Sequence, residues 1–548
     1  MTDKELADLI FPNLTKTVED YEEMYPEREL PEGARVTRFA PSPTGFVHIG
    51  NLLQALTDFL LARTSDGGVY YLRNEDTDTK REVNEAVKKI IETLEYANIM
   101  PDEYEADGKV IGNYGPYVQS ERKEIYHAFI KRAIEMGRAY PCFCSSEELD
   151  VMRKKQEAKK VMPGYYGAWA KCRDLTNEER AERIKNGESF VIRFKSMGNP
   201  MRKVKYNDLV TGVIEFPENN NDMVIMKSND FLPTYHFAHL VDDHLMRTTH
   251  VVRGQEWLPS VPLHIELFEA FGYKQPAYIH NCLLLKQDGD IRRKISKRKD
   301  PEALMSYYVE KGYPSISVIE SLMTILNSNY EEWRDNNPDA SFLEFPFNPA
   351  KVGTTGALYD LEKLDNISKN IISKMTKEEV YEELCKYAST FDKDFYEIIT
   401  KNPDYTKDIL NIEREQEKPR KDFACWSDVK KSIWYMYDEL YTPVEFEWKS
   451  ITDINEIKSI VNTYFDEYYD ENDDKDTWFN KVKELTEKLG YASNMKDYKK
   501  NPENYKGSVA DISTVIRVAV TSRSQTPDLY CILKLLGKTR IKERINNL

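Results

Sequence analysis

Residues 35–63 read RVTRFAPSPTGFVHIGNLLQALTDFLLAR, and this stretch decides the fold. Its first six residues alternate in polarity like a β-strand, and the prolines and glycine that follow are typical of a turn. From residue 48 onward, apolar side chains recur at the spacing of a helix. A second predicted strand at 68–73 and a second predicted helix at about 82–97 complete the pattern. The sequence therefore predicts a parallel βαβ unit.

The same alternation returns from residue 222 onward. Predicted strands and helices follow one another at 222–227, 234–246, 250–254, 259–271 and 277–285. We expect these elements to complete the sheet that the first unit begins, which makes the catalytic domain α/β and Rossmann-like. The intervening residues break the rhythm and contain a close cysteine pair, so they are predicted to form an inserted domain.

Periodicity and composition divide the whole chain into six predicted parts. They are an N-terminal extension without an assigned role (1–34), the first half of the sheet (35–115), the insertion (116–221), the second half with a basic loop (222–300), a helical domain (301–370) and a longer helical region (371–548). The last region contains amphipathic helical patterns and few strand signals, so we expect it to be all-α.

Composition restricts the class of protein. The chain has 548 residues, too many for one hydrophobic core, and no apolar run approaches the ~18 residues of a membrane span. A net charge of −16 argues against a protein that coats nucleic acid without selectivity. Seven scattered cysteines and an acidic N-terminus without a secretory signal predict a cytoplasmic protein with no membrane partner and no disulfide framework.

Two distant motifs have the chemistry of nucleotide binding. His48, Gly50 and Asn51 fall at a predicted helix N-terminus, where backbone amides and an imidazole can meet phosphate, and Gly50 leaves room for an adenine ring. The second motif, KISKR, begins at Lys294. The ammonium groups of Lys294 and Lys297 are suited to stabilise charge on a departing pyrophosphate. We therefore expect His48, Lys294 and Lys297 to act in catalysis, and these residues with Gly50, Asn51 and Ser296 to bind ATP.

RFAPSPTGFVHIGN (38–51) resembles the first signature of class I aminoacyl-tRNA synthetases, and KISKR resembles their second. Together with LRNEDTD (72–78), YHFAHLVDDHLM (235–246) and THVVRGQEW (249–257), the first signature is similar to bacterial-type glutamyl-tRNA synthetases. The resemblance extends from about residue 35 to the C-terminus. Asn51 stands where the general HIGH pattern has a second histidine, and the 34 leading residues precede the point where the family usually begins.

This resemblance implies a catalytic domain of the class I fold, an insertion that binds the tRNA acceptor end, an all-α stem-contact domain and an all-α anticodon-binding region. It implies ATP and Mg²⁺ as cofactors and L-glutamate and tRNA(Glu) as substrates of a monomeric ligase. Glutamyl-adenylate would form first, and the terminal adenosine of the tRNA would then accept the glutamyl group. Whether tRNA(Gln) is also charged is left open by the sequence.

Glutamate carries two carboxylates and one ammonium, so its site needs cations or donors and one anion. By the resemblance, Arg38 would bind the side-chain carboxylate with the help of Tyr235, Glu75 would bind the α-ammonium, and Arg253 would complete the carboxylate contacts. The remaining expected members of the glutamate site are Ala40, Ser42 and His239, the last at a place where the family often has asparagine.

Cys142, Cys144 and Cys172 resemble the zinc-binding knuckle in the inserted domain of some family members. Thiolates are strong zinc ligands, but a structural zinc site needs four ligands. Tyr166 or Asp174 is a candidate fourth ligand. The alternative interpretation is a set of reduced cysteines that only pack.

Three other functions fit part of the sequence. A small-molecule adenylyltransferase shares the histidine loop but usually has a far shorter chain. A synthetase relative that glutamylates a modified tRNA base lacks the helical third. A non-catalytic tRNA-binding relative would have lost active-site motifs, whereas Arg38, His48, Glu75, Lys294 and Lys297 are all present.

Overall fold

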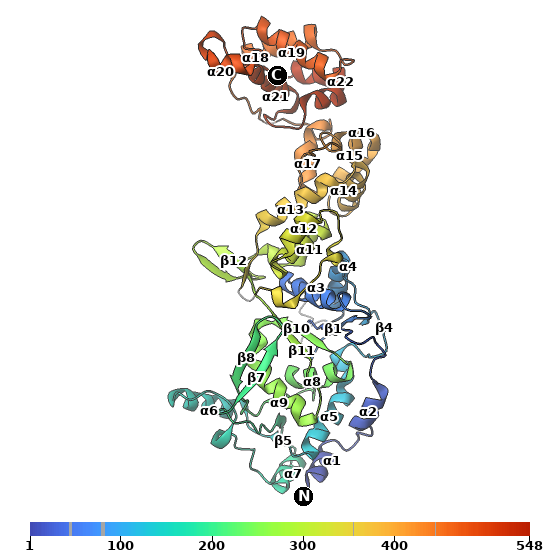
Figure 1. Ribbon diagram of the computed structural model, residues 1–548, viewed down its shortest axis with the longest axis vertical. Coiled ribbons are helices and arrows are strands. Elements are labelled where there is room, and N and C mark those ends of the chain that lie inside the picture. Colours follow the sequence, from blue (N-terminus) through green and yellow to red (C-terminus); the bar gives the residue numbers. More distant parts are fainter. Residues whose placement is uncertain (43–46, 78–82, 354–355, 444) are drawn as a thin grey trace. The chain divides into compact units, whose positions relative to one another are not determined.

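The computed structural model describes residues 1–42, 47–77, 83–353, 356–443 and 445–548 (Figure 1). The chain forms two compact units. The first consists of Met1–Tyr307 and Ile319–Asp360, and the second of Tyr308–Val318 and Leu361–Leu548. Within the described ranges, no helix has both the length and the apolar character needed to cross a bilayer.

Two parallel strand pairs lie at the centre of the first unit. β1 (Val36–Phe39) pairs with β2 (Val69–Leu72), and β10 (His250–Gly254) pairs with β11 (Ala277–Asn281). The two pairs meet where the Thr249 amide donates to the Val36 carbonyl oxygen at 2.9 Å. These strands lie where the sequence predicts them, as do the helices α3 (Ile49–Arg63), α4 (Val83–Tyr96), α8 (Tyr235–Leu245) and α9 (Val261–Phe271).

Helices cover these strands from two sides. α3 is apolar over most of its surface, with residues such as Leu53 and Leu60 fully buried, as expected of a helix enclosed by other elements. α9 places Val261 and Ile265 in one cluster with Val251 and Tyr278 of β10 and β11. In Figure 1, α3 and α9 lie on opposite sides of these strands.

One predicted strand belongs to a different sheet. β9 (Val224–Met226) does not join the parallel pairs, because it runs antiparallel to β6 (Val191–Phe194). β6 in turn runs antiparallel to β5 (Ala139–Cys142). The expectation that residues 222–227 continue the parallel sheet is therefore wrong. A short apolar run is compatible with any buried strand, and periodicity does not identify its partner.

The residues between the two parallel pairs form short strands and capped helices. In chain order the remaining elements are β3 (Tyr104–Ala106), β4 (Lys109–Ile111), α5 (Lys123–Glu135), α6 (Ser146–Ala158), α7 (Asn177–Lys185), β7 (Lys203–Asp208) and β8 (Gly212–Pro217). Ser145 and Thr176 begin α6 and α7 through capping boxes with Glu148 and Glu179. β7 and β8 form an antiparallel hairpin whose turn begins at Asp208.

The N-terminal extension is folded onto the first unit. α1 (Asp3–Ile10) and α2 (Val18–Met24) begin at capping boxes on Thr2 and Thr17. Both helices pack against α5, and their buried residues, including Leu6 and Tyr21, belong to the same core cluster as Phe129.

Polar contacts tie this extension to distant parts of the unit. Both Arg28 Nη atoms donate to the Glu103 carboxylate at 2.8 and 2.9 Å, and Nε donates to the Met246 carbonyl oxygen at 3.0 Å. Glu22 accepts from His244 at 2.6 Å and from Arg247 at 2.8 Å. Burial opposes ionisation of Glu22, but these two partners outweigh it and lower the pKa to about 2.

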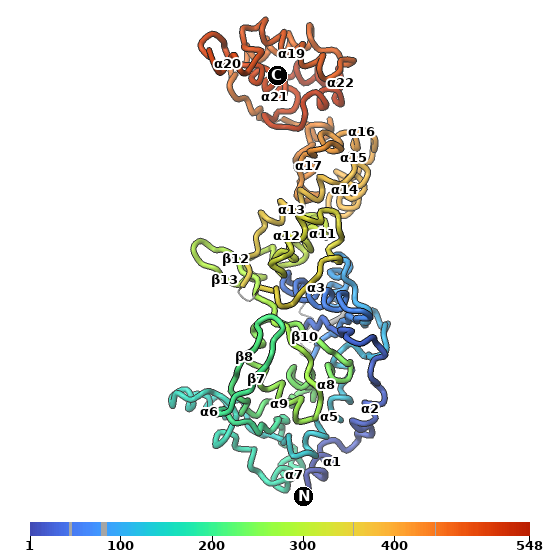
Figure 2. Tube along the Cα trace, in the orientation of Figure 1, coloured from blue at the N-terminus to red at the C-terminus, as the bar shows by residue number. Residues whose placement is uncertain are grey.

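A hairpin carrying the basic motif completes the first unit. β12 (Leu284–Asp288) runs antiparallel to β13 (Ile291–Lys294) and parallel to β14 (Ala357–Leu358). This hairpin stands out from the body of the unit in Figure 2. The next helices are α10 (Met305–Lys311), α11 (Ser315–Leu326) and α12 (Tyr330–Asn336).

The second unit has its own core. Its described residues after 360 contain the helices α13 (Leu361–Lys374), α14 (Lys377–Phe391), α15 (Lys393–Lys401), α16 (Pro403–Leu410), α17 (Ser427–Ile433), α18 (Ile454–Thr463), α19 (Lys475–Lys488), α20 (Met495–Lys500), α21 (Val509–Thr521) and α22 (Leu529–Asn546). One apolar cluster extends from Ile372 to Ile545 and includes fully buried residues such as Leu384, Val482 and Ile532.

We predict that Arg28→Ala destabilises the first unit. The substitution leaves the mostly buried Glu103 carboxylate without its bidentate partner, which costs about 3 kcal/mol for pairs of this kind. Guanidinium unfolding should show the loss in the transition of the first unit. The control is Lys4→Ala, which removes the exposed pair with Asp8 and should change stability by less than about 0.5 kcal/mol. Equal losses in both variants would contradict the proposed role of Arg28.

Candidate active site

A cavity of about 280 Å³ opens at the end of β1, between the start of α3, the start of α8 and the end of β10. Residues that the sequence predicts for the site contribute much of its lining, namely Arg38, Ala40, Ser42, Asn51, Glu75, Tyr235 and Arg253. The sequence did not single out Gln54, Glu256 and Trp257, which also line it. Pro43 and Gly45, predicted to shape the first loop, lie outside the described residues.

Arg38 is buried at the end of β1. Its Nε donates to Asp243 Oδ1 at 3.2 Å, and its Nη1 donates to the Val252 carbonyl oxygen at 3.1 Å. The side chain is only 1% exposed, yet it lines the cavity. Arg38 therefore presents a positive charge to the cavity in one fixed orientation.

Two neighbouring aspartates on α8 organise the cations behind the cavity. Asp243 accepts from Arg38 and also from Arg73 Nη1 at 2.7 Å. Asp242 accepts from Arg122 Nε at 2.7 Å and from Tyr126 at 2.8 Å. Burial favours the neutral acid, but the nearby Arg38 and Arg73 hold the pKa of Asp243 well below its ordinary value. Sequence reasoning missed this role, although two adjacent acids directly after Leu240 and Val241 in a predicted helix are a signal that could have revealed it.

Glu75 supplies an acidic group to the cavity. Its Oε1 accepts from Arg73 Nη2 at 3.1 Å. Burial raises the pKa of Glu75 above its ordinary value, and Arg73 offsets this only in part. A cation entering the cavity would therefore favour the ionised carboxylate.

Tyr235 and His239 stand one turn apart on α8 but have different environments. Tyr235 lines the cavity and packs on Trp257 with ring centroids 4.2 Å apart. His239 is fully buried and hydrogen-bonds Asp243 through Nδ1 and the Tyr278 hydroxyl through Nε2, the latter at 2.7 Å. It is not among the residues that line the cavity. Its direct contact with glutamate stays a prediction.

His48 begins α3, and its ring is held in one tautomer. Its Nδ1 accepts from the Gly50 amide at 2.9 Å, so in the neutral imidazole the proton is on Nε2. Burial, Lys297 and Lys294 lower its pKa to about 4, which keeps the ring neutral at physiological pH. A Cβ on Gly50 would lie 3.1 Å from Nδ1, so this glycine also makes room for the imidazole.

Asn51 has a structural role that its departure from the HIGH pattern did not reveal. Its Oδ1 accepts from the His48 amide at 3.2 Å, which completes a capping box at the start of α3.

The basic motif begins at Lys294, the last residue of β13, and is folded around Asp300. This carboxylate accepts from Arg293 at 2.6 and 2.7 Å and from the Ser296 amide at 2.9 Å. Ile295 is buried, whereas Lys294 is exposed and its Nζ lies 3.9 Å from Glu256 Oε1. The charges of Lys297 and Lys294 contribute, after burial, to the lowered pKa of His48 in the first motif.

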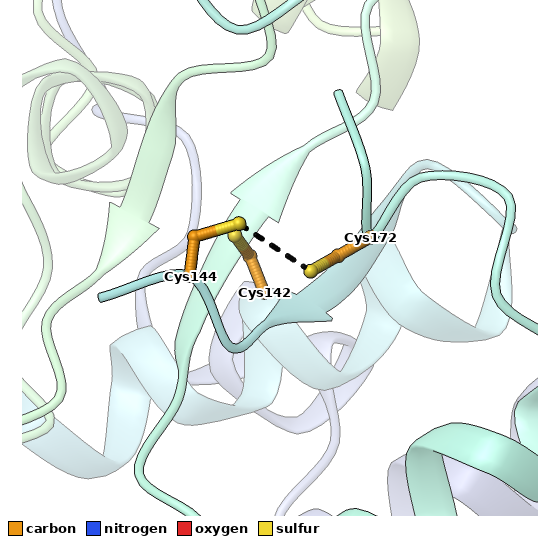
Figure 3. Close-up of side chains that lie close together, drawn as sticks. All are labelled: Cys142, Cys144 and Cys172. Carbon is orange, nitrogen blue, oxygen red and sulfur yellow. Dashed lines mark hydrogen bonds between the residues drawn. The ribbon is translucent and has the colours of Figure 1, made fainter. Parts of the chain in front are cut away.

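Cys142, Cys144 and Cys172 converge at a second place in the first unit (Figure 3). Their sulfur atoms lie within 4.8 Å of one another, with Cys144 Sγ 3.7 Å from Cys172 Sγ. This separation fits two thiolates on one tetrahedral zinc ion, whose Zn–S bonds are about 2.3 Å.

The oxygen beside these sulfurs belongs to Tyr165. Its Oη lies 3.4 Å from Cys142 Sγ and 3.3 Å from Cys144 Sγ. Tyr166, which the sequence suggested as a fourth ligand, instead donates to the Met162 carbonyl oxygen. The structure therefore brings Tyr165, and not Tyr166, next to the sulfurs, because adjacent residues in an irregular loop point in different directions.

The fold and the site together define a class of enzyme. The family model described as the catalytic domain of class I tRNA synthetases (E and Q) matches residues 35–332. This range contains both motifs, the cavity and the cysteine cluster.

Curated relatives narrow the class. Glutamate–tRNA ligases from Clostridium perfringens strain 13 and from Acetivibrio thermocellus are each 49% identical to this chain over essentially its whole length and theirs. The crystal structure of a glutamate tRNA ligase from Elizabethkingia meningosepticum, in complex with its amino acid, superimposes with a TM-score of 0.74 at 26% identity and covers 94% of this chain and 99% of that one. The chain belongs to the glutamate–tRNA ligase family.

Proposed function

We propose that this protein activates L-glutamate with ATP and transfers the glutamyl group to the 3′-terminal adenosine of tRNA(Glu). The observation that carries the proposal is the cavity, where two buried arginines and one largely buried glutamate share the space beside the N-terminus of α3. Two cationic groups and one acid match the two carboxylates and the ammonium of glutamate.

Each group has a role in binding glutamate. Arg38 and Tyr235 receive the side-chain carboxylate, Glu75 receives the α-ammonium, and Arg253 completes the carboxylate contacts. Ala40 and Ser42 also line the cavity. A site that satisfies a substrate carboxylate with buried cations rejects the neutral amide, because the cations would then lack their counter-charge.

ATP binds beside this cavity. The α3 N-terminus and the imidazole of His48 lie next to the phosphates, and Lys294, Ser296 and Lys297 contact the departing pyrophosphate. Mg²⁺ would supply charge neutralisation on the phosphates. The protein itself contributes no nucleophile, because the glutamate carboxylate attacks the α-phosphate directly.

We further infer that residues 116–221 bind the tRNA acceptor end, 301–370 contact the stem and 371–548 read the anticodon. The anticodon of a tRNA lies far from its acceptor end, so a catalytic domain cannot contact both. The helical second unit, with its own core, is the part of the chain left for that contact.

We predict that the purified protein charges tRNA(Glu) with labelled glutamate and discriminates against glutamine by roughly 10⁴-fold or more in kcat/KM, as buried carboxylate recognition does. Aminoacylation should be measured with each amino acid, and separately with tRNA(Glu) and tRNA(Gln). If glutamine is used equally well, or if no tRNA is charged, the assignment of the cavity is wrong.

We predict that Lys297→Ala lowers kcat by about 10²-fold with little change in the KM for glutamate, because its ammonium acts on charge that develops in the transition state. Lys299→Ala removes an equal charge two residues away and should change kcat less than about threefold. An effect of Lys297→Ala confined to KM would remove this lysine from catalysis.

We also propose that Cys142, Cys144, Cys172 and the Tyr165 oxygen hold a structural zinc ion. The support is the donor set, three thiols and one phenol oxygen gathered around one point from segments up to 30 residues apart in the chain. Such an ion would fix the loop of Tyr165 against β5.

We predict about one zinc per chain by elemental analysis, and its loss in Cys144→Ser together with a lower melting temperature. Cys531→Ser, which alters a cysteine of the second unit, should retain the metal. Fully active protein that contains no zinc and is unaffected by a chelator would contradict the proposal.

A further inference from the structure

Arg253 is held differently from the other arginine of the cavity. Its side chain is only 3% exposed, and among the described residues no acid forms an ion pair with it. Arg38, by contrast, pairs with Asp243. A buried cation without an anion is costly, so the structure around Arg253 must satisfy its N–H groups by other means.

Two histidines provide those means. Arg253 Nε donates to His280 Nε2 at 3.0 Å, and Nη1 donates to His264 Nδ1 at 3.0 Å. An arginine only donates, so both imidazole nitrogens must be unprotonated acceptors. Burial lowers the pKa of both histidines, which agrees with neutral rings. The face of the guanidinium is covered by the Tyr278 ring, whose centroid is 4.4 Å from Cζ.

Asp208 fixes the proton of His280 on the required nitrogen. His280 Nδ1 lies 2.6 Å from Asp208 Oδ2. Because the ionised carboxylate only accepts, Nδ1 carries the proton and Nε2 keeps its lone pair for Arg253. The other carboxylate oxygen, Oδ1, accepts from the Val210 amide and from the amide and hydroxyl of Thr211 at 2.9–3.1 Å. The turn of the β7–β8 hairpin therefore holds Oδ1 of Asp208, which leaves Oδ2 oriented toward His280.

His264 is fixed in the same directional way. Its Nδ1 accepts from Arg253, so its Nε2 carries the proton and donates to His236 Nδ1 at 2.9 Å. In both chains of hydrogen bonds, from Arg253 through His280 to Asp208 and from Arg253 through His264 to His236, each donor lies on the side of the guanidinium. Of the three guanidinium nitrogens of Arg253, Nη2 is buried and has no hydrogen-bond partner among the described residues. Arg253 itself lines the cavity.

We propose that Asp208, His280 and His264 are positioning residues that hold Arg253 through neutral acceptors, so that its full positive charge and its Nη2 donors are reserved for a carboxylate of the bound amino acid. This inference rests on the proposed function. A direct Arg253–Asp pair would satisfy the same N–H groups but would cancel the charge that the substrate needs. The imidazole of His280 lies between the Arg253 guanidinium and the Asp208 carboxylate, so it separates the two charges while both side chains stay hydrogen-bonded.

Asp208→Asn tests the inference with a nearly isosteric change outside the cavity. Three donors hold the Oδ1 position, so the amide oxygen stays there and the NH₂ group faces His280. That NH₂ donates to Nδ1 and moves the histidine proton to Nε2, where it opposes the Arg253 Nε–H. We expect the KM for glutamate in tRNA charging to rise about tenfold or more, with kcat within about threefold of wild type and an unchanged melting temperature.

The matched control is Glu215→Gln on the same hairpin. It is also an acid-to-amide change, but Glu215 binds the exposed Lys203 and Lys205. Its KM for glutamate should equal that of wild type. If wild type charges tRNA and Asp208→Asn leaves this KM unchanged, the positioning role is wrong while the proposed function stands. If wild type charges no tRNA with glutamate, the proposed function itself fails.

A pair of His280 variants keeps the test valid if Asp208→Asn does not fold. The amide of His280→Gln reaches the Nε2 position and can still accept from Arg253. The amide of His280→Asn reaches only the Nδ1 position and serves Asp208 alone. We expect His280→Asn to raise the KM for glutamate about tenfold and His280→Gln to restore most of the loss. Equal KM values in the two variants would overturn the proposal.

Discussion

The first unit depends on two adjacent carboxylates in the middle of α8. Successive residues on a helix point about 100° apart, so Asp242 and Asp243 reach different partners. Asp242 binds Arg122, Tyr126 and Gln119 from the segment after β4. Asp243 binds Arg38 near the end of β1 and Arg73 just after β2. Because every one of these groups is buried, loss of one carboxylate would leave uncompensated cations in the core, a change that typically costs about 3–5 kcal/mol.

Asp243 also explains how arginine side chains can stay charged while they are buried beside the cavity. Arg38 forms an ion pair with Asp243 and donates to the Val252 carbonyl oxygen, so its position is fixed before any ligand binds. Arg73 divides its donors between Asp243 and Glu75, which links the acidic group of the cavity to the same network. Preorganisation of this kind avoids reorganisation when a charged substrate binds.

Signals within single segments made the central part of the fold predictable. The rest was not predictable because it depends on pairing between distant segments. Turn residues and buried apolar runs identify β1, α3 and β10, because these signals lie within the segments themselves. The partner of β9 depends on strands formed over 30 residues earlier, which periodicity does not encode. The motifs identified most residues of the cavity, whereas Asp208, His264 and His280 lie outside any motif and are recognisable only once the hairpin, α9 and β11 are seen together.

The docking of α1 and α2 has a consequence for how the chain is made. Glu22 and Arg247 are 225 residues apart, and Arg28 and Met246 are 218 residues apart. The ribosome produces these two helices before their partners, which follow only after roughly 10–45 s at about 5–20 residues per second. During that interval the apolar faces of α1 and α2, which later cover α5, lack part of the surface that they contact in the folded unit. The segment of α1 and α2 can therefore complete its contacts only after translation has passed residue 247.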